Sequence, residues 1–75
     1  MGKFAVILVF STSHAIHAER VLTRGGFDVK LIPTPRHLSS DCGSAVRIAD
    51  DAQAQAEKAL ASAGVTIDRI EPLDD

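Results

Sequence analysis

Residues 3–10 read KFAVILVF, an apolar run that decides the fold. The run is rich in valine and isoleucine and is too short for a buried helix. It therefore predicts a strand that is covered on both faces and lies near the centre of a sheet. Successive side chains of a strand point to opposite faces. One face thus carries Phe4, Val6, Leu8 and Phe10, and the other carries Ala5, Ile7 and Val9.

A helix is expected directly after this strand. Ser11-Thr12-Ser13 offers hydroxyl groups for its N-cap. Small and apolar residues then recur at helical spacing and form one face. These residues are Ala15, Ala18, Val21, Leu22 and Gly25. The pair Gly25-Gly26 ends the helix, because glycine is common just beyond a helix C-terminus.

Two further strands are expected on either side of a polar loop. Residues Phe27–Pro33 alternate between apolar and polar, which predicts a half-buried strand. Pro33 and Pro35 end this strand, because proline cannot donate a backbone hydrogen bond to a neighbouring strand. The polar loop Thr34–Asp41 follows. Residues Gly43–Ala49 then predict a third strand, with Val46 and Ile48 on one face.

The last third of the chain predicts a helix and a strand. Asp50 or Asp51 can cap the helix, and Gln53 suits a capping box with Asp50. The inward stripe is formed mostly by alanines, which let the helix lie close to the sheet: Ala52, Ala56, Ala59, Leu60 and Ala63. Residues Val65–Glu71 predict the final strand, and Pro72–Asp75 predict a frayed acidic tail.

The predicted elements follow the order β-α-β-β-α-β within one domain, residues 1–75. Short loops and right-handed crossovers leave few ways to arrange this order, and the ferredoxin-like fold is the natural one. We therefore expect an α+β fold, with a four-stranded antiparallel sheet and two helices on one face. The first and third strands are then antiparallel neighbours, which brings residues Ser11–His14 close to Cys42.

Composition excludes several classes of partner. Eight Lys and Arg are outnumbered by ten Asp and Glu, and there is no Tyr or Trp, so neither a basic patch nor a stacking platform for nucleic acid is indicated. The longest apolar run is far shorter than the ~20 residues that span a bilayer. The first residues show no signal-peptide pattern, and a single cysteine cannot form an internal disulfide. We expect a cytoplasmic protein without membrane contact, metal or cofactor.

Cys42 is the residue most suited to carry chemistry. It lies in Ser39-Ser40-Asp41-Cys42-Gly43, whereas a structural cysteine usually has apolar neighbours. Amide groups of a nearby helix N-terminus favour the thiolate, which is the nucleophilic form, although Asp41 opposes this by like-charge repulsion. The alternative interpretation is a spare thiol at the start of a strand.

Residues near Cys42 in the expected fold could assist it. His14, in the first helical turn beside Ser13, could act as a base, and Arg36 in the loop could hold a small anion. Either could equally be a solvated surface residue. A zinc site made by His14, His37 and Cys42 has no support from ligand spacing.

The face of the sheet away from the helices is a second candidate for function. Its apolar residues on the first strand would be joined by Ile32 and Ala45. Two helices can cover only one face, so we expect the other to be exposed to water unless another chain covers it. A homodimer through this open sheet face is the simplest arrangement.

The stretch Pro33–Gly43, PTPRHLSSDCG, resembles the selenium/sulfur carrier protein-like family, small bacterial domains. The most specific part is Pro35-Arg36 together with Ser39-Ser40-x-Cys42-Gly43, and the resemblance covers nearly the whole chain. It implies that Cys42 is the carrier residue, within a motif that also holds Arg36, Ser39, Ser40 and Gly43. The expected strand order adds Ser13 and His14 to the residues around the bound atom. His37 departs from the usual residue in this loop.

The resemblance implies a sulfur or selenium carrier more than a stand-alone enzyme. Cys42 would take the atom from a donor protein as a persulfide or selenopersulfide and pass it to an acceptor protein. Two alternatives remain: a small anion-binding regulatory domain, and a protein–protein interaction module without cysteine chemistry.

Overall fold

The computed structural model describes residues 3–38 and 43–73. Its elements are β1 (Phe4–Leu8), α1 (Thr12–Arg24), β2 (Lys30–Pro33), β3 (Ser44–Ala49), the 3-10 turn η1 (Asp50–Ala52), α2 (Gln53–Ser62) and β4 (Arg69–Leu73). The four strands form one sheet in the order β2-β3-β1-β4, and every neighbouring pair is antiparallel. This order confirms the ferredoxin-like α+β fold.

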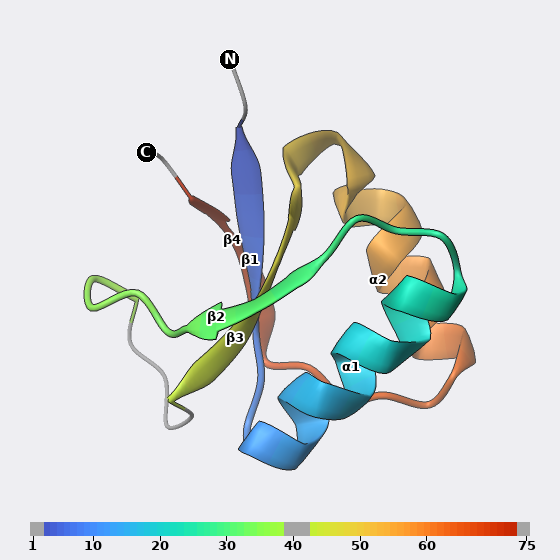
Figure 1. Cartoon of the computed structure of the whole chain (residues 1–75), viewed down its shortest axis with the longest axis horizontal. Coiled ribbons are helices and arrows are strands. Elements are labelled where there is room, and N and C mark those ends of the chain that lie inside the picture. The colour runs from blue at the N-terminus through green and yellow to red at the C-terminus, as the bar shows by residue number, and fades with distance from the viewer. Residues whose placement is uncertain (1–2, 39–42, 74–75) are drawn as a thin grey trace.

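The central position predicted for the first strand is confirmed. β1 lies between β3 and β4, and residues 5–9 are each at most 1% exposed. Figure 1 shows α1 and α2 together on one side of the sheet. The main core fills the space between them and the sheet. It consists of Ala5, Ile7, Val9, Ala15, Ala18, Leu22, Val46, Ile48, Ala56, Leu60 and Val65.

Both helices are short. Ser11 caps α1 as the sequence predicts, since its side chain accepts a hydrogen bond from the backbone N–H of His14 at 3.2 Å. α1 ends at Arg24, and Gly26 follows with φ 86°, a left-handed conformation that glycine adopts without strain. In the described part of the chain, no helix is long and apolar enough to cross a membrane.

The second helix begins differently from the prediction. The chain leaves β3 through η1 before α2 begins at Gln53, and the N–H of Asp50 donates to the carbonyl of Lys3 at 3.2 Å. The predicted capping box is therefore wrong. Asp50 lies too early to cap α2, and its carboxylate instead accepts a hydrogen bond from the Gln53 side chain at 2.7 Å.

The predicted bounds of the second and fourth strands are also corrected. Phe27 and Val29 pack against the core, but pairing with β3 begins only at Lys30, opposite Arg47.

β4 begins at Arg69, opposite the last residue of β1, and not at Val65. It continues through Pro72, which was expected in a frayed tail. An edge strand tolerates proline, since its outward N–H positions need no partner.

We expected the sheet face away from the helices to be exposed to water, but its centre is buried. Val6, Leu8 and Ala45 form a second apolar cluster and are 0% exposed. Leu38 from the loop after β2 packs against this cluster, and Figure 1 shows that loop on the side of the sheet opposite the helices. A single chain thus buries this centre without a second copy.

Replacing Leu22 by alanine should strongly destabilise the domain. Leu22 is fully buried against the core, so its loss should lower the free energy of unfolding by about 2–4 kcal/mol in urea denaturation. Ile16, on the same helix but 40% exposed, is the matched control, and Ile16→Ala should cost less than about 1 kcal/mol. Equal losses for both variants would contradict this assignment of the core.

Candidate functional site

The candidate site is the loop between β2 and β3 together with the start of α1. Cys42, Ser39 and Ser40 lie outside the described residues, so the site is defined by the segments that flank them. These segments are Thr34–Leu38 on one side and Gly43 on the other.

The two ends of this loop are joined by the backbone. The N–H of Thr34 donates to the carbonyl of Gly43 at 3.0 Å, which extends the β2–β3 pairing by one step. A tight turn follows, closed by the N–H of Leu38 and the carbonyl of Pro35 at 3.0 Å. Arg36 and His37 occupy the two central positions of this turn, and both side chains are exposed.

Leu38 attaches the loop to the sheet. It is half-buried and contacts the cluster of Val6, Leu8 and Ala45. Leu38 therefore fixes the chain four residues before Cys42, while the pairing of Gly43 fixes the residue directly after it. Both neighbours of the cysteine segment are thus positioned by the fold.

The register of β1 and β3 places the start of α1 at the same end of the sheet. Leu8 pairs with Ala45, so the residues that follow β1 lie beside the residues that precede Ala45. The N-cap Ser11 comes only three residues after Leu8. Two of the expected site residues, Ser13 and His14, therefore lie at the end of the sheet where Gly43 enters β3.

The first turn of α1 is held by a pair of hydrogen bonds at Ser11. The Ser11 hydroxyl lies 3.1 Å from Nδ1 of His14 and also accepts the His14 backbone N–H. With Nδ1 unprotonated, the hydroxyl donates to it, so His14 is engaged in the helix cap and its ring is half-buried. Ser13 is exposed. Its backbone N–H lies in the first turn of the helix, where N–H groups have no acceptor within the helix.

The structure does not bring all expected site residues together. Figure 1 shows the turn at residues 36–37 on the side of the sheet away from α1. Arg36 and the first turn of α1 therefore lie on different sides of the sheet. Arg36 forms no ion pair in the described part of the chain. Over residues 3–38 and 43–73, no three His, Cys, Asp or Glu side chains are grouped closely enough to hold a metal ion.

Two features were missed by the sequence reasoning. Leu38 was treated as part of a polar loop, although it is the one large apolar residue there and could have been identified as an anchor. The second feature is a pair of cations. Lys30 lies directly opposite Arg47 on the sheet face away from the helices, and the Arg47 guanidinium lies 4.2 Å from the centre of the Phe4 ring.

Comparison with protein families gives one result. The family described as "Putative Se/S carrier protein-like" matches residues 4–72, which includes every described strand except the last residue of β4, and both helices. No curated protein and no solved structure matches the chain.

Removing the helix cap should destabilise α1 measurably. Ser11→Ala leaves the His14 N–H without its acceptor, so the free energy of unfolding should fall by about 1 kcal/mol. Ser11→Asp keeps a capping oxygen and should stay close to the parent protein. Urea denaturation of the three proteins tests this, and a Ser11→Asp variant as unstable as Ser11→Ala would contradict it.

Shortening Leu38 should release the loop from the sheet. In Leu38→Ala, amide hydrogen exchange at Thr34 and Leu38 should accelerate, because both bonds depend on the loop staying in place. Exchange in the main core should change little. Leu31→Ala, at a position that is 41% exposed on β2, is the control. Unchanged exchange in Leu38→Ala would show that Leu38 is not the anchor.

Proposed function

Because the chain belongs to the Se/S carrier protein-like family, we propose that it carries a sulfur or selenium atom on Cys42. The family match is the observation that supports this proposal most directly. Cys42 is the only cysteine in the chain, so a thiol-based carrier function can reside nowhere else.

The surroundings of the loop suit a carrier. A carrier must present its thiol first to a donor protein and then to an acceptor, so the reactive segment has to be accessible. The flanking residues Arg36, His37 and Gly43 are all exposed. The ends of the loop are nevertheless held in place, by the packing of Leu38 and by the Thr34–Gly43 hydrogen bond.

The proposed transfer needs no outside oxidant or reductant. The Cys42 thiolate attacks the terminal sulfur of a donor persulfide, a new S–S bond forms, and the S–S bond of the donor breaks. The donor cysteine leaves as a thiolate, and Cys42 becomes a persulfide. A thiolate of the acceptor then attacks the terminal sulfur, and Cys42 leaves as its original thiolate. A selenium atom follows the same steps.

Two groups of this chain can stabilise the terminal anion. The first-turn amides of α1 carry the positive end of the helix dipole, and the exposed Arg36 guanidinium supplies a full charge with several donors. Arg36 and the first turn of α1 lie on opposite sides of the sheet (Figure 1). We therefore assign them to different stages, in which the terminal atom is exchanged with partners that approach from different sides.

Loading of Cys42 can be tested by mass spectrometry. After incubation with a cysteine desulfurase and cysteine, the intact protein should gain the mass of one sulfur atom, and a thiol reductant should remove it. The Cys42→Ser variant should gain nothing.

A relocated thiol provides the matched control. The double variant Cys42→Ser, Ser62→Cys keeps one cysteine but places it at an exposed position at the end of α2. The parent protein should load at least about tenfold faster than this variant, if the site and not the thiol alone determines reactivity. Equal loading rates, or no loading of the parent, would overturn the proposal.

A further inference from the structure

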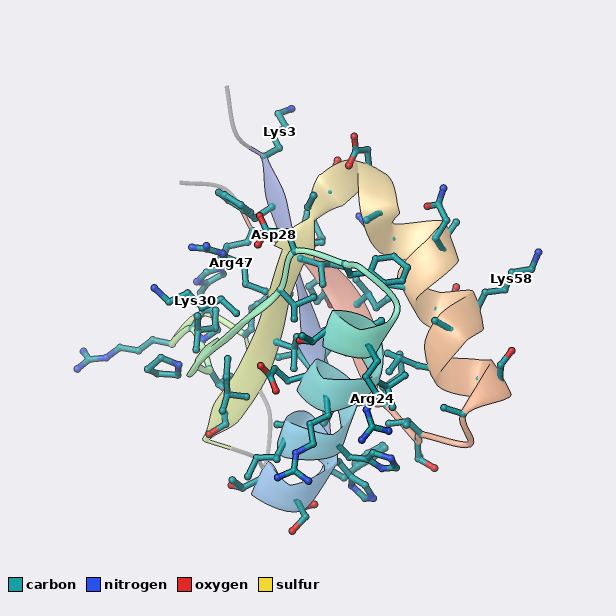
Figure 2. The ribbon with its side chains drawn as sticks, turned by 45° about the vertical axis from the view of Figure 1, so that its right-hand side comes forward. Lys3, Arg24, Asp28, Lys30, Arg47 and Lys58 are labelled. Carbon is teal, nitrogen blue, oxygen red and sulfur yellow. The ribbon has the colours of Figure 1, made fainter. Side chains whose placement is uncertain are left out.

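The sheet face away from the helices carries a pair of cations whose charge is not neutralised within the described chain. Lys30 and Arg47 are register partners on β2 and β3, so their side chains share this face. Figure 2 shows both on the same side of the sheet, while Lys58 of α2 lies on the other side of the molecule. Neither forms an ion pair with a carboxylate in the described residues.

The other charged groups near this face form no ion pair with Lys30 or Arg47 in the described residues. Arg69 and Glu71 on β4 share the face, but the Arg69 side chain donates to Glu71 and to Asp68 at 2.8 Å each. Asp28, two residues before Lys30, is the remaining carboxylate nearby, and it forms no ion pair in the part of the chain that the structure describes.

This arrangement is unfavourable for the isolated domain. Like charges directly opposite each other on neighbouring strands destabilise a sheet. An opposite charge at either position would form a cross-strand ion pair instead. The repulsion between the two cations thus lowers the stability of a domain that has little stability to lose. This indicates that the pair has a role other than folding.

Arg47 is already held in place for binding. Its guanidinium stacks on the Phe4 ring at 4.2 Å, and the side chain is half-buried. Ordering a flexible cation normally costs affinity, and a pre-positioned guanidinium avoids part of that cost. The planar group can still donate two parallel hydrogen bonds to a carboxylate.

The neighbours of the two cations fit a protein better than a free ion. Three half-buried apolar side chains share this face, namely Phe4, Ile32 and Leu73. A partner chain could contact these residues while its carboxylates bind the cations. A free inorganic anion would use only the charges.

We propose that this face is the docking site for an acidic segment of a partner protein, whose carboxylates bind Lys30 and Arg47. The loop that leads to Cys42 leaves the sheet on the same side (Figure 1), and Leu38 packs on the same face. A partner bound here would therefore reach that loop. That the partner is a sulfur or selenium donor or acceptor rests on the proposed function; the docking face itself does not.

A glutamate-rich peptide is a suitable probe, followed by the backbone amide shifts of the protein in an NMR titration. The parent protein should show shifts centred on Phe4, Lys30 and Arg47, and the affinity should fall as ionic strength rises. Lys30→Glu should weaken binding about fivefold or more, because it replaces an attraction with a repulsion. The same variant should not lower the midpoint of thermal unfolding, since it turns a like-charge pair into an opposite-charge pair.

Lys58→Glu is the matched control, because it changes the net charge by the same amount on the opposite side of the molecule. It should retain the parent affinity within about twofold. Equal weakening by both variants, or shifts spread over the whole surface, would overturn the proposal. Inorganic sulfate that produces the same shifts as tightly as the peptide would also overturn it, in favour of a simple anion site.

The outcome is separable from that of the carrier proposal. Peptide binding involves no sulfur chemistry, so Cys42→Ala should bind the probe as the parent does. Loss of persulfide loading with intact peptide binding contradicts only the carrier function, and the reverse result contradicts only the docking face.

Discussion

The burial of β1 on both faces is the constraint on which the rest of the structure depends. This strand pairs with β3 on one edge and β4 on the other, and its side chains enter both apolar clusters. Each buried Val, Leu or Ile contributes about 1.5–3 kcal/mol. A domain of this size has a total stability of only about 4–11 kcal/mol, so losing the cover of either face would be serious. Both faces of β1 must be covered, and the two helices can cover only one of them.

The two faces are closed in different ways, and the difference positions the candidate site. α1 and α2 cover one face with small side chains, of which Ala15, Ala18 and Ala56 are fully buried and let the helices approach closely. On the other face, Ile32 of β2 and Leu38, which belongs to the loop before β3, pack against the apolar centre. The segment with Cys42 is therefore attached to a residue that the core itself needs. The packing of Leu38 thus couples residues 34–38 of this loop to the stability of the sheet.

The topology could be predicted from the sequence because several separate features agree on one arrangement of the strands and helices. A two-sided apolar strand, two helices with small inward residues and short connections leave the ferredoxin-like order as the natural arrangement. The errors fell where tertiary context overrides local pattern. Val65 and Ile67 alternate as a strand does, yet they pack against the core before pairing begins at Arg69. Asp50 and Gln53 have capping-box spacing, yet the Asp50 N–H that such a box would use donates to Lys3 instead.

The site was predictable only in part for a related reason. Ser11 as N-cap and the proximity of α1 to the start of β3 follow from local chemistry and strand order. The charge pair could not be found this way, because Lys30 and Arg47 become neighbours only through the exact register of β2 with β3. A shift of one residue would place them on opposite faces. The register is itself supported by Val46, which enters the main core on the helix side, and by Ile32 and Ala45, which pack together on the other side. The same apolar pairing that stabilises the sheet thus places two cations together on the face away from the helices, where a partner that approaches the loop would meet their charge.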